Sequence, residues 1–262
     1  MTEWNAELYS QRSALQKAMA AEVLGLLQLN GSESILDVGC GDGNITAQIA
    51  ARAARGSVVG VDASENMIDL ASSKFSPKVH PNLRFQVADA RELAFREQFD
   101  LVVSFNALHW IPEQDRALRS IFVASKPGGT AQLRLVPMGE RKSIETVLEE
   151  TRSSARWSGY FVGFHDPYLR LTPEQYGALA EQAGFRVRRI HTELKAWDFG
   201  SREIFSAFSS VTMVEWTRRL PETDRPAFVT DVLDRYQSVA ADKPVEENMF
   251  KFYQLDITLD KT

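Results

Sequence analysis

Short apolar runs alternate with amphipathic stretches over the first half of the chain. Continuous apolar runs predict buried strands, and apolar residues at a helical spacing predict helices. The runs predict strands at 34–38, 57–62, 83–89, 99–106 and 130–136. The amphipathic stretches predict helices at 13–29, 45–53, 64–74 and 113–125. Strands that alternate with helices in this way predict a parallel sheet covered on both faces, with right-handed crossovers.

Cap and turn residues mark several of these boundaries. Asn30-Gly31 ends the first helix, Ser64 is a suitable N-cap, and Pro112 suits a helix entrance. Lys126-Pro127-Gly128-Gly129 is expected to end the helix before it and to turn the chain into the fifth strand.

The pattern changes after residue 136. Helices are expected at 141–156, 172–184, 201–217 and 222–238, and an aromatic-rich loop at 157–170. Strands are expected at 185–194 and 249–259. We therefore expect one α/β domain over 1–262, with a Rossmann-like, doubly wound, mostly parallel seven-stranded sheet and an N-terminal helix. Its core would be about 30–136 plus the last two strands, and cap segments at about 1–29, 141–170 and 197–245 would form a helical cap inserted late in the chain.

The predicted topology gathers several polar residues at one edge of the sheet. Ligands of such sheets bind beyond the carboxyl ends of the parallel strands. The turn Gly39–Gly43 follows the first strand, and Asp62, Asp89 and Asn106 end or follow the next three. These positions are far apart in sequence, and we expect them to line one ligand-binding edge.

Composition narrows the class of protein without selecting a function. The 262 residues are 44% hydrophobic and 25% charged, which is ordinary for a soluble protein. A net charge of −5 gives no basic footprint for nucleic acid. The single cysteine fits a reducing compartment, and we expect no signal peptide and no membrane span. These features predict a cytoplasmic protein whose oligomeric state the sequence leaves open.

The segment Asp37-Val38-Gly39-Cys40-Gly41-Asp42-Gly43 carries the strongest chemical signal. Its G-x-G-x-G spacing differs from the G-x-G-x-x-G of dinucleotide-binding turns, which favours S-adenosylmethionine (SAM) over NAD. Acids beside the turn suit an ammonium and a sulfonium better than a pyrophosphate. Asp62 is placed to bridge ribose hydroxyls, and Asp89 could accept a hydrogen bond from an adenine amino group. Cys40 is interpreted as a small turn residue rather than a reactive thiol.

The turn resembles motif I of the class I SAM-dependent methyltransferases. Val61-Asp62 resembles motif II, Val87-Ala88-Asp89-Ala90 motif III, and the stretch from Leu118 to Gly129 the later motifs. The resemblance covers about 34–136 and implies SAM as cofactor and S-adenosyl-L-homocysteine as product. We expect no metal, because the sequence has no paired histidine or carboxylate spacing suited to one. The cofactor-binding residues it implies are Tyr9, Asp37, Gly39, Cys40, Gly41, Asp42, Asp62, Ala63, Met67, Asp89, Ala90 and Asn106.

The segment after the fourth strand bears on the methyl acceptor. It lacks the Asn/Asp-Pro-Pro-Tyr/Phe of enzymes that methylate DNA or protein amides. Leu108-His109-Trp110-Ile111 instead resembles the trans-aconitate and juvenile hormone acid methyltransferase families, with looser matches at 8–16, 157–168 and 214–217. This resemblance implies a small organic acid as partner, with Gln16, His109 and Trp110 at its carboxylate.

The residue chemistry agrees with an acid but leaves alternatives open. A carboxylate is ionised at neutral pH and needs hydrogen-bond donors rather than a general base. Gln16, His109 and Trp110 can all donate. Alternatively, His109 acts as general base on a phenol, hydroxyl or amine. A third hypothesis is a SAM-binding protein without enzymatic activity.

Several further residues keep two interpretations. Arg134, Arg152, Arg156 and Arg170 could clamp extra carboxylates of a polyacid or be ordinary surface residues. The aromatics of 157–168 and those near 199–216 could line an apolar pocket or pack the cap. We expect the segments 9–16 and 197–240 to close over bound SAM.

Overall fold

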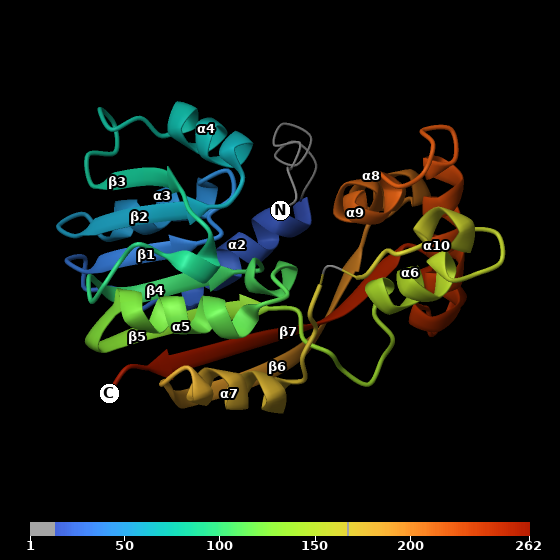
Figure 1. Ribbon diagram of the computed structural model, residues 1–262. Coiled ribbons are helices and arrows are strands. Elements are labelled where there is room, and N and C mark those ends of the chain that lie inside the picture. The colour runs from blue at the N-terminus through green and yellow to red at the C-terminus, as the bar shows by residue number, and fades with distance from the viewer. Residues whose placement is uncertain (1–13, 167) are drawn as a thin grey trace. The chain divides into compact units, whose positions relative to one another are not determined.

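The computed structural model describes residues 14–166 and 168–262, apart from the side chains at 14, 16 and 17 (Figure 1). The chain divides into two compact units. The first, here the sheet unit, contains the described residues up to Pro137, Tyr168–Thr192 and Gln254–Thr262. The second, here the helical unit, contains Met138–Pro167 and Glu193–Tyr253.

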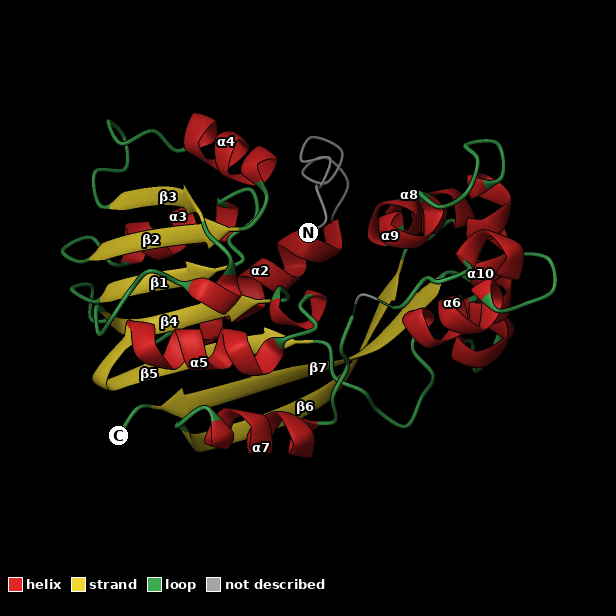
Figure 2. Ribbon diagram, in the orientation of Figure 1, coloured by secondary structure: helices red, strands yellow, loops and turns green. Residues whose placement is uncertain are grey.

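One seven-stranded sheet has the order β3-β2-β1-β4-β5-β7-β6 (Figure 2). Strands β1 to β4 each pair in parallel with their neighbours, β4 and β5 are parallel, and β7 runs antiparallel to β5. This order confirms the predicted doubly wound, mostly parallel sheet. The strand bounds are β1 Ser34–Val38, β2 Ser57–Asp62, β3 Leu83–Val87, β4 Phe99–Phe105, β5 Ser125–Leu135, β6 Arg186–Asp198 and β7 Met249–Asp260.

Helices cover both faces of the sheet unit (Figure 2). They are α2 Ala14–Leu26, α3 Asn44–Arg52, α4 Glu65–Lys74, α5 Gln114–Ala124 and α7 Pro173–Gln182, with the single turns η1 Ala90–Glu92 and η2 Leu108–Trp110. The predicted N-cap is confirmed, because Ser64 Oγ accepts a hydrogen bond from the backbone of Met67 at the start of α4.

Successive side chains of β1 point to opposite faces of the sheet and so belong to two different core clusters. Ile35 packs in a cluster with α3 residues, whereas Leu36 and Val38 pack in a cluster with α5 and α7 residues. All three side chains are at most 1% exposed. Burying an aliphatic side chain of this size stabilises a fold by roughly 1.5–3 kcal/mol. The rigid centre of the sheet thus fixes the loops at its edge.

Two predicted boundaries were wrong. Lys126–Gly129 lies inside β5 rather than forming a turn before it. Phe99 pairs with Ser125 and Leu101 with Thr130, so the intervening residues of β5 bulge out of register. The helix predicted at 201–217 is broken at Met213 into α8 Arg202–Thr212 and α9 Val214–Thr217.

The helical unit contains α6 Ile144–Arg152, η3 Ser158–Phe161, α8, α9, α10 Arg225–Ala240 and η4 Pro244–Glu246. Its interior is aromatic: the rings of Trp157 and Phe161 lie 5.2 and 5.6 Å from that of Phe228, and Phe199 stacks on Phe205 at 4.8 Å. These five side chains are buried. They pack the unit's own core rather than line an open pocket.

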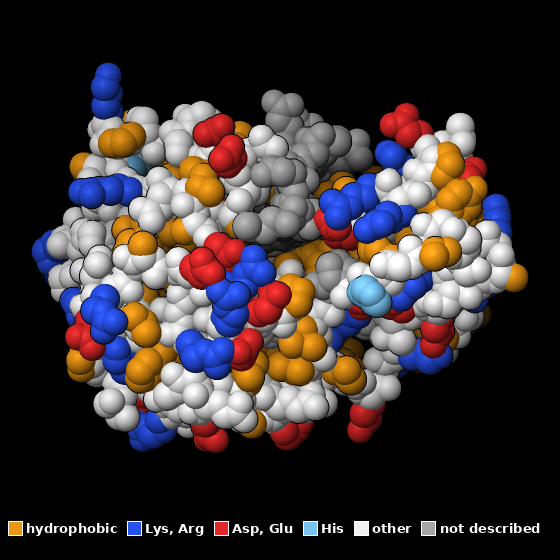
Figure 3. Space-filling view, viewed as in Figure 1, with side chains coloured by type: hydrophobic (Ala, Val, Ile, Leu, Met, Phe, Trp, Pro, Cys, Tyr) orange, Lys and Arg blue, Asp and Glu red, His pale blue; other side chains and the backbone are white. Residues whose placement is uncertain are grey.

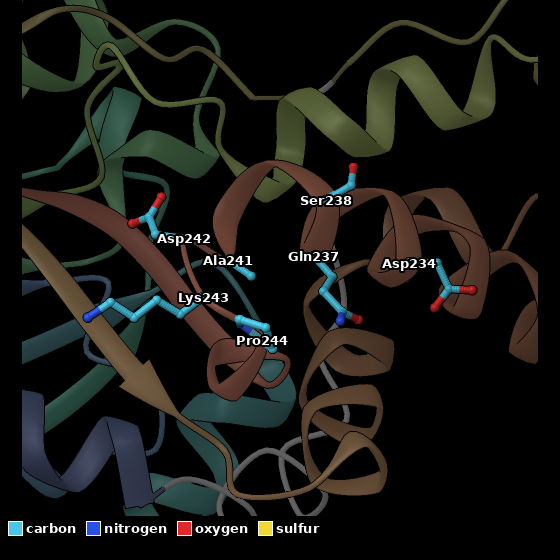
Figure 4. A pocket seen from close by; sticks show the side chains of 7 residues that line it. All are labelled: Asp234, Gln237, Ser238, Ala241, Asp242, Lys243 and Pro244. Carbon is cyan, nitrogen blue, oxygen red and sulfur yellow. The ribbon is translucent and has the colours of Figure 1, made fainter.

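A hollow lies beside the C-terminal end of α10 in the helical unit (Figure 4). Asp242 borders it, but its carboxylate is already paired with Arg141 and Lys251. On the face shown in Figure 3, acidic and basic side chains are intermingled. No helix within the described part of the chain is long and apolar enough to cross a membrane.

Candidate functional site

The glycine turn 39–43 joins β1 to α3 at the carboxyl edge of the sheet. Gly39 has a left-handed backbone (φ 77°), and its N–H donates to the carbonyl of Val61 over 2.7 Å. A Cβ at Gly39 would lie 2.2 Å from the Cβ of Ala107, in the turn after β4. At Gly41, also left-handed, a Cβ would meet no described residue within 4 Å. Gly39 therefore lets two turns of the protein touch, whereas the described residues leave space beside Gly41.

Asp62, at the end of β2, holds the glycine turn in place. Its Oδ2 accepts the N–H of Gly41 at 2.9 Å, and its Oδ1 accepts the N–H of Ser64 at 3.0 Å. The predicted proximity of Asp62 to the turn is confirmed, and both of its carboxylate oxygens accept backbone N–H groups at this edge of the sheet.

Asp37 precedes the turn and is 2% exposed. Thr46 Oγ1 donates to its Oδ2 over 2.7 Å. Burial raises the pKa of Asp37 to about 7, against the opposing effect of the Thr46 hydrogen bond and with a smaller contribution from the Asp62 charge. Sequence reasoning missed Thr46, although its place in the first turn of α3 after an acid-glycine turn was a usable signal.

This buried acid makes the stability of the free protein depend on pH. The folded chain binds the Asp37 proton more tightly than an unfolded chain, whose aspartate has a pKa near 3.8. The stabilisation is complete below that value and is lost as pH rises to about 7. Asp37→Asn should therefore raise the free energy of unfolding by roughly 2 kcal/mol more at pH 8 than at pH 5, as measured by denaturant titration.

Asp100→Asn is a control of opposite sign. Backbone and Lys126 hydrogen bonds lower the pKa of Asp100 despite its desolvation, so its ionised form stabilises the fold. Its amide variant should be less stable than the wild type, more so at pH 8 than in acid. A stability difference for Asp37→Asn that stays constant with pH contradicts the assignment.

The remaining turn residues have partners inside the protein. Asp42 pairs with Lys74 at 2.9 Å, with Asn44 donating to the same oxygen at 2.5 Å. Cys40 is buried, and burial together with nearby aspartates raises the pKa of its thiol. The thiol is therefore protonated, which agrees with its interpretation as a small turn residue. Met67 is buried in α4, and Ala63 is half-buried next to Asp62.

Asp89 follows β3 and begins η1. The Arg91 guanidinium donates to both carboxylate oxygens at 2.6–3.0 Å and lowers the pKa of Asp89. Arg91 also contacts Glu113 at 2.8 Å. The carboxylate predicted to meet an adenine amino group is thus already held by a neighbour that sequence reasoning missed. Ala90, the next residue, is buried in the main core.

The turn after β4 brings Asn106, His109 and Trp110 together. Asn106 is left-handed (φ 57°), and Trp110 Nε1 donates to its carbonyl over 3.2 Å. The ring of Tyr168 meets that of Trp110 edge-on, with centroids 4.3 Å apart. The Trp110 N–H predicted to hold an acceptor is therefore used within the turn, and we call residues 106–110 the acceptor turn.

The His109 side chain is half-buried and its imidazole is neutral in this setting. Burial, with the nearby positive charge of Arg170, lowers its pKa to about 3. The backbone N–H of Val136 points at Nδ1 over 3.5 Å, so we assign the single ring proton to Nε2. Arg170 belongs to a short segment fixed by a hydrogen bond from Gln114 to the Leu169 carbonyl.

Other predicted positions lie elsewhere or outside the description. Tyr9 and the Gln16 side chain are outside the described residues, although Gln16 falls within α2. Arg134 is 4% exposed and forms ion pairs with Asp256 and Glu22, so its charge is matched by two carboxylates.

Arg152 and Arg156 pair with Glu149 and Asp231 in the helical unit. Arg134, Arg152 and Arg156 thus form ion pairs within the protein, which favours a structural role over binding of a polyacid. Among the described residues, no cluster of three metal-ligating side chains occurs.

A doubly wound sheet with a glycine turn after β1 and an acid at the end of β2 defines a class of α/β proteins that bind nucleotide-like cofactors. A family model described as a methyltransferase domain matches residues 35–129. Trans-aconitate 2-methyltransferase of Deinococcus radiodurans is 31% identical over 185 residues, which cover 69% of each chain. The chain belongs to the SAM-dependent methyltransferases.

Two further similarities extend over almost the whole chain. Trans-aconitate 2-methyltransferase of Delftia acidovorans is 24% identical over 100% of this chain and 99% of its own. The structure of phosphoethanolamine N-methyltransferase 2 from Haemonchus contortus, in complex with S-adenosyl-L-methionine, matches with a TM-score of 0.59 at 20% identity. That match covers 94% of this chain and 52% of the other. The second similarity concerns the fold alone.

Proposed function

We propose that this methyltransferase esterifies the carboxylate of a small organic acid. The observation that carries the proposal is His109, a half-buried, neutral imidazole whose Nε2–H can donate but whose basicity is low. A carboxylate needs a donor and no proton removal, which is what this side chain offers. Two relatives described as trans-aconitate 2-methyltransferases support an acid as acceptor.

The polar groups at the carboxyl edge of the sheet are suited to binding SAM. No described residue would meet a Cβ at Gly41, and Asp62 places its carboxylate beside the glycine turn, where it accepts the N–H groups of Gly41 and Ser64. We propose that the turn 39–43, Asp62, Asp89 and Asn106 hold the cofactor, together with the other positions named from the sequence. When bound, SAM would supply a methyl group on a sulfonium, which a carboxylate oxygen can accept while the electron pair of the broken carbon–sulfur bond stays on sulfur.

Charge near His109 favours an anionic acceptor. The same Arg170 charge that disfavours imidazolium at His109 attracts a carboxylate. The protein's task is then to align one carboxylate oxygen with the methyl carbon. We also propose that the cap closes over bound SAM and that Gln16 and Tyr9 contribute to the site. The proposed location of the protein is cytoplasmic.

General-base catalysis by His109 is the competing hypothesis. An imidazole with a pKa of about 3 takes protons from phenols or ammonium groups poorly at neutral pH. The structure therefore offers no observation that favours this second function over the first.

Transfer of labelled methyl from SAM into a panel of acids, phenols and amines tests the proposal. An acid should give a product that is cleaved by mild base, as expected of a carboxyl methyl ester. Label that enters only phenols or amines, in base-stable products, would overturn the carboxylate assignment and leave the methyltransferase assignment intact.

The pH profile should separate donor from base. Between pH 6 and pH 9 neither the carboxylate nor His109 titrates, but Asp37 has a pKa of about 7 in the free protein. We therefore expect kcat, with SAM and acid both saturating, to change less than about twofold over this range in Asp37→Asn, in which that acid is absent. A histidine base of ordinary pKa would instead make kcat fall tenfold per pH unit below about 6. A stopped assay in constant-ionic-strength buffers distinguishes the two.

A further inference from the structure

Gln254 reaches from β7 to the ends of two parallel strands. Its side chain is buried, with 1% exposed. The amide nitrogen donates to Asn106 Oδ1 over 3.0 Å and to the carbonyl of Leu135 over 2.8 Å. Asn106 follows β4 and Leu135 ends β5. One amide group therefore ties the start of the acceptor turn, which follows β4, to the end of β5.

The requirement for two donors fixes the orientation of this amide. Because both partners are oxygens, the nitrogen must face them and Oε1 must face away. Among the described residues, Gln254 Oε1 has no hydrogen-bond partner. A buried acceptor without a partner costs about 1–3 kcal/mol. An apolar side chain of equal length would avoid that cost but would take the donor away from Asn106 Oδ1 and the Leu135 carbonyl, so the glutamine is explained by the two contacts that its nitrogen makes.

Asn106 is the residue that this amide controls. It adopts a left-handed backbone, which asparagine tolerates better than most residues other than glycine. Three contacts hold it: its N–H donates to Arg134 O at 2.7 Å, its carbonyl accepts from Trp110, and its side chain accepts from Gln254. Gln254 supplies the only one of these three that acts on the side chain.

The position of Asn106 sets the spacing between two functional segments. Ala107, the next residue, packs against Gly39 so closely that no Cβ would fit at Gly39. His109 and Trp110 follow within the same turn. A displacement of Asn106 therefore moves the acceptor turn relative to the glycine turn 39–43.

We propose that Gln254 is a positioning residue for methyl transfer, acting through Asn106 on the distance between acceptor and cofactor segments. The proposal rests on the proposed site in the sheet unit, but not on the acceptor being an acid. Small errors in the alignment of reacting groups reduce the rate of the chemical step more than they weaken binding. Asn106 is one of several proposed cofactor contacts, and the two hydrogen bonds of the Gln254 amide nitrogen reach neither the turn 39–43 nor Asp62. Loss of the Gln254 amide should therefore lower kcat by a larger factor than it weakens SAM binding.

Gln254→Met tests this, because methionine keeps the length and removes both donors. We expect kcat to fall about tenfold or more, with the SAM Kd changing less than about threefold. The matched control is Thr258→Val, which removes another β7–β5 side-chain hydrogen bond, from Thr258 to Gln132 at 2.8 Å, on the same strand. Its kcat should stay within twofold of wild type. Equal kcat values for the two folded variants overturn the proposal.

A double-mutant cycle shows whether the effect passes through Asn106. Asn106→Gly keeps the left-handed backbone accessible and deletes the side-chain acceptor. In that background, Gln254→Met should lower kcat by less than about threefold, because the two residues act as one unit. The same loss in both backgrounds would overturn the route through Asn106.

A second readout needs no acceptor substrate. Hydrogen exchange of the Trp110 indole N–H, followed by NMR, reports the contact between Trp110 and Asn106. It should speed up at least tenfold in Gln254→Met and stay unchanged in Thr258→Val. Unchanged exchange in both variants counts against the proposal.

Two provisions keep the test decisive. If Gln254→Met does not fold, Gln254→Asn, whose shorter amide cannot span both partners, takes its place under the same criteria. Activity is measured with whichever acceptor the panel identifies. A base-stable product therefore overturns the carboxylate proposal without affecting this one.

Discussion

Gly39→Ala should destabilise the free protein by roughly 3 kcal/mol or more, which lowers Tm by about 6–12 °C. Two effects combine at this position. The backbone is left-handed, which costs an alanine about 1–2 kcal/mol. The new methyl group would also lie 2.2 Å from the Cβ of Ala107, so the glycine turn and the acceptor turn must separate. SAM binding should weaken in parallel, measurable by calorimetry.

Alanine variants of two other left-handed glycines show how much of the destabilisation comes from backbone strain and how much from the steric clash with Ala107. Gly41 and Gly128 have φ of 53° and 78°, and within residues 14–166 and 168–262 a Cβ at either would have no neighbour closer than 4 Å. Their alanine variants should lose only the roughly 1–2 kcal/mol of backbone strain. Thermal unfolding without ligand suffices for the comparison. A Gly39→Ala protein as stable as Gly128→Ala would show that the contact with Ala107 yields easily.

His109→Phe should lower kcat/KM by on the order of 100-fold, the loss typical when one donor to a reacting group is removed. His109→Gln should retain activity within about tenfold of wild type, because its amide nitrogen can donate from a position similar to Nε2. A general base would give a different result, since neither glutamine nor phenylalanine can take up a proton. The two variants would then be equally inactive.

His191→Gln is the matched control for loss of a histidine. His191 lies on β6 within the sheet unit and is exposed. Its variant should have wild-type kcat/KM, and SAM affinity should be unchanged in all three proteins. Equal losses in His109→Phe and His109→Gln, with SAM binding intact, would reject the donor role.

The sequence predicted β1 and β2 to the residue, because continuous buried apolar runs bounded by turns leave little freedom in placing a central strand. It also predicted that the glycine turn and Asp62 share one edge, which the parallel pairing of β1 with β2 confirms. Both successes depend on local pattern and on the topology that follows from it.

The features that the sequence did not predict depend on contacts with residues that are distant in the sequence or that occupy a polar group expected to bind ligand. The Arg91 ion pair replaces the open carboxylate expected at Asp89, and the Trp110 N–H turns inward to Asn106. Gln254 carries no local signal, since its partners are reached only through the pairing of β7 with β5. The break in the helix at 201–217 likewise has no proline or glycine to mark it.

The Gln254 contact also constrains the order of events during folding. The two residues it joins are 148 positions apart, so the acceptor turn and its tether leave the ribosome at different times. The first five strands can pair before β7 exists, since their parallel ladders involve only residues up to Arg134. Pairings of such long sequence separation form late and slowly. A nascent chain that already contains the whole glycine turn would thus bind cofactor before it could align an acceptor, so cofactor affinity and turnover would mature in separate steps.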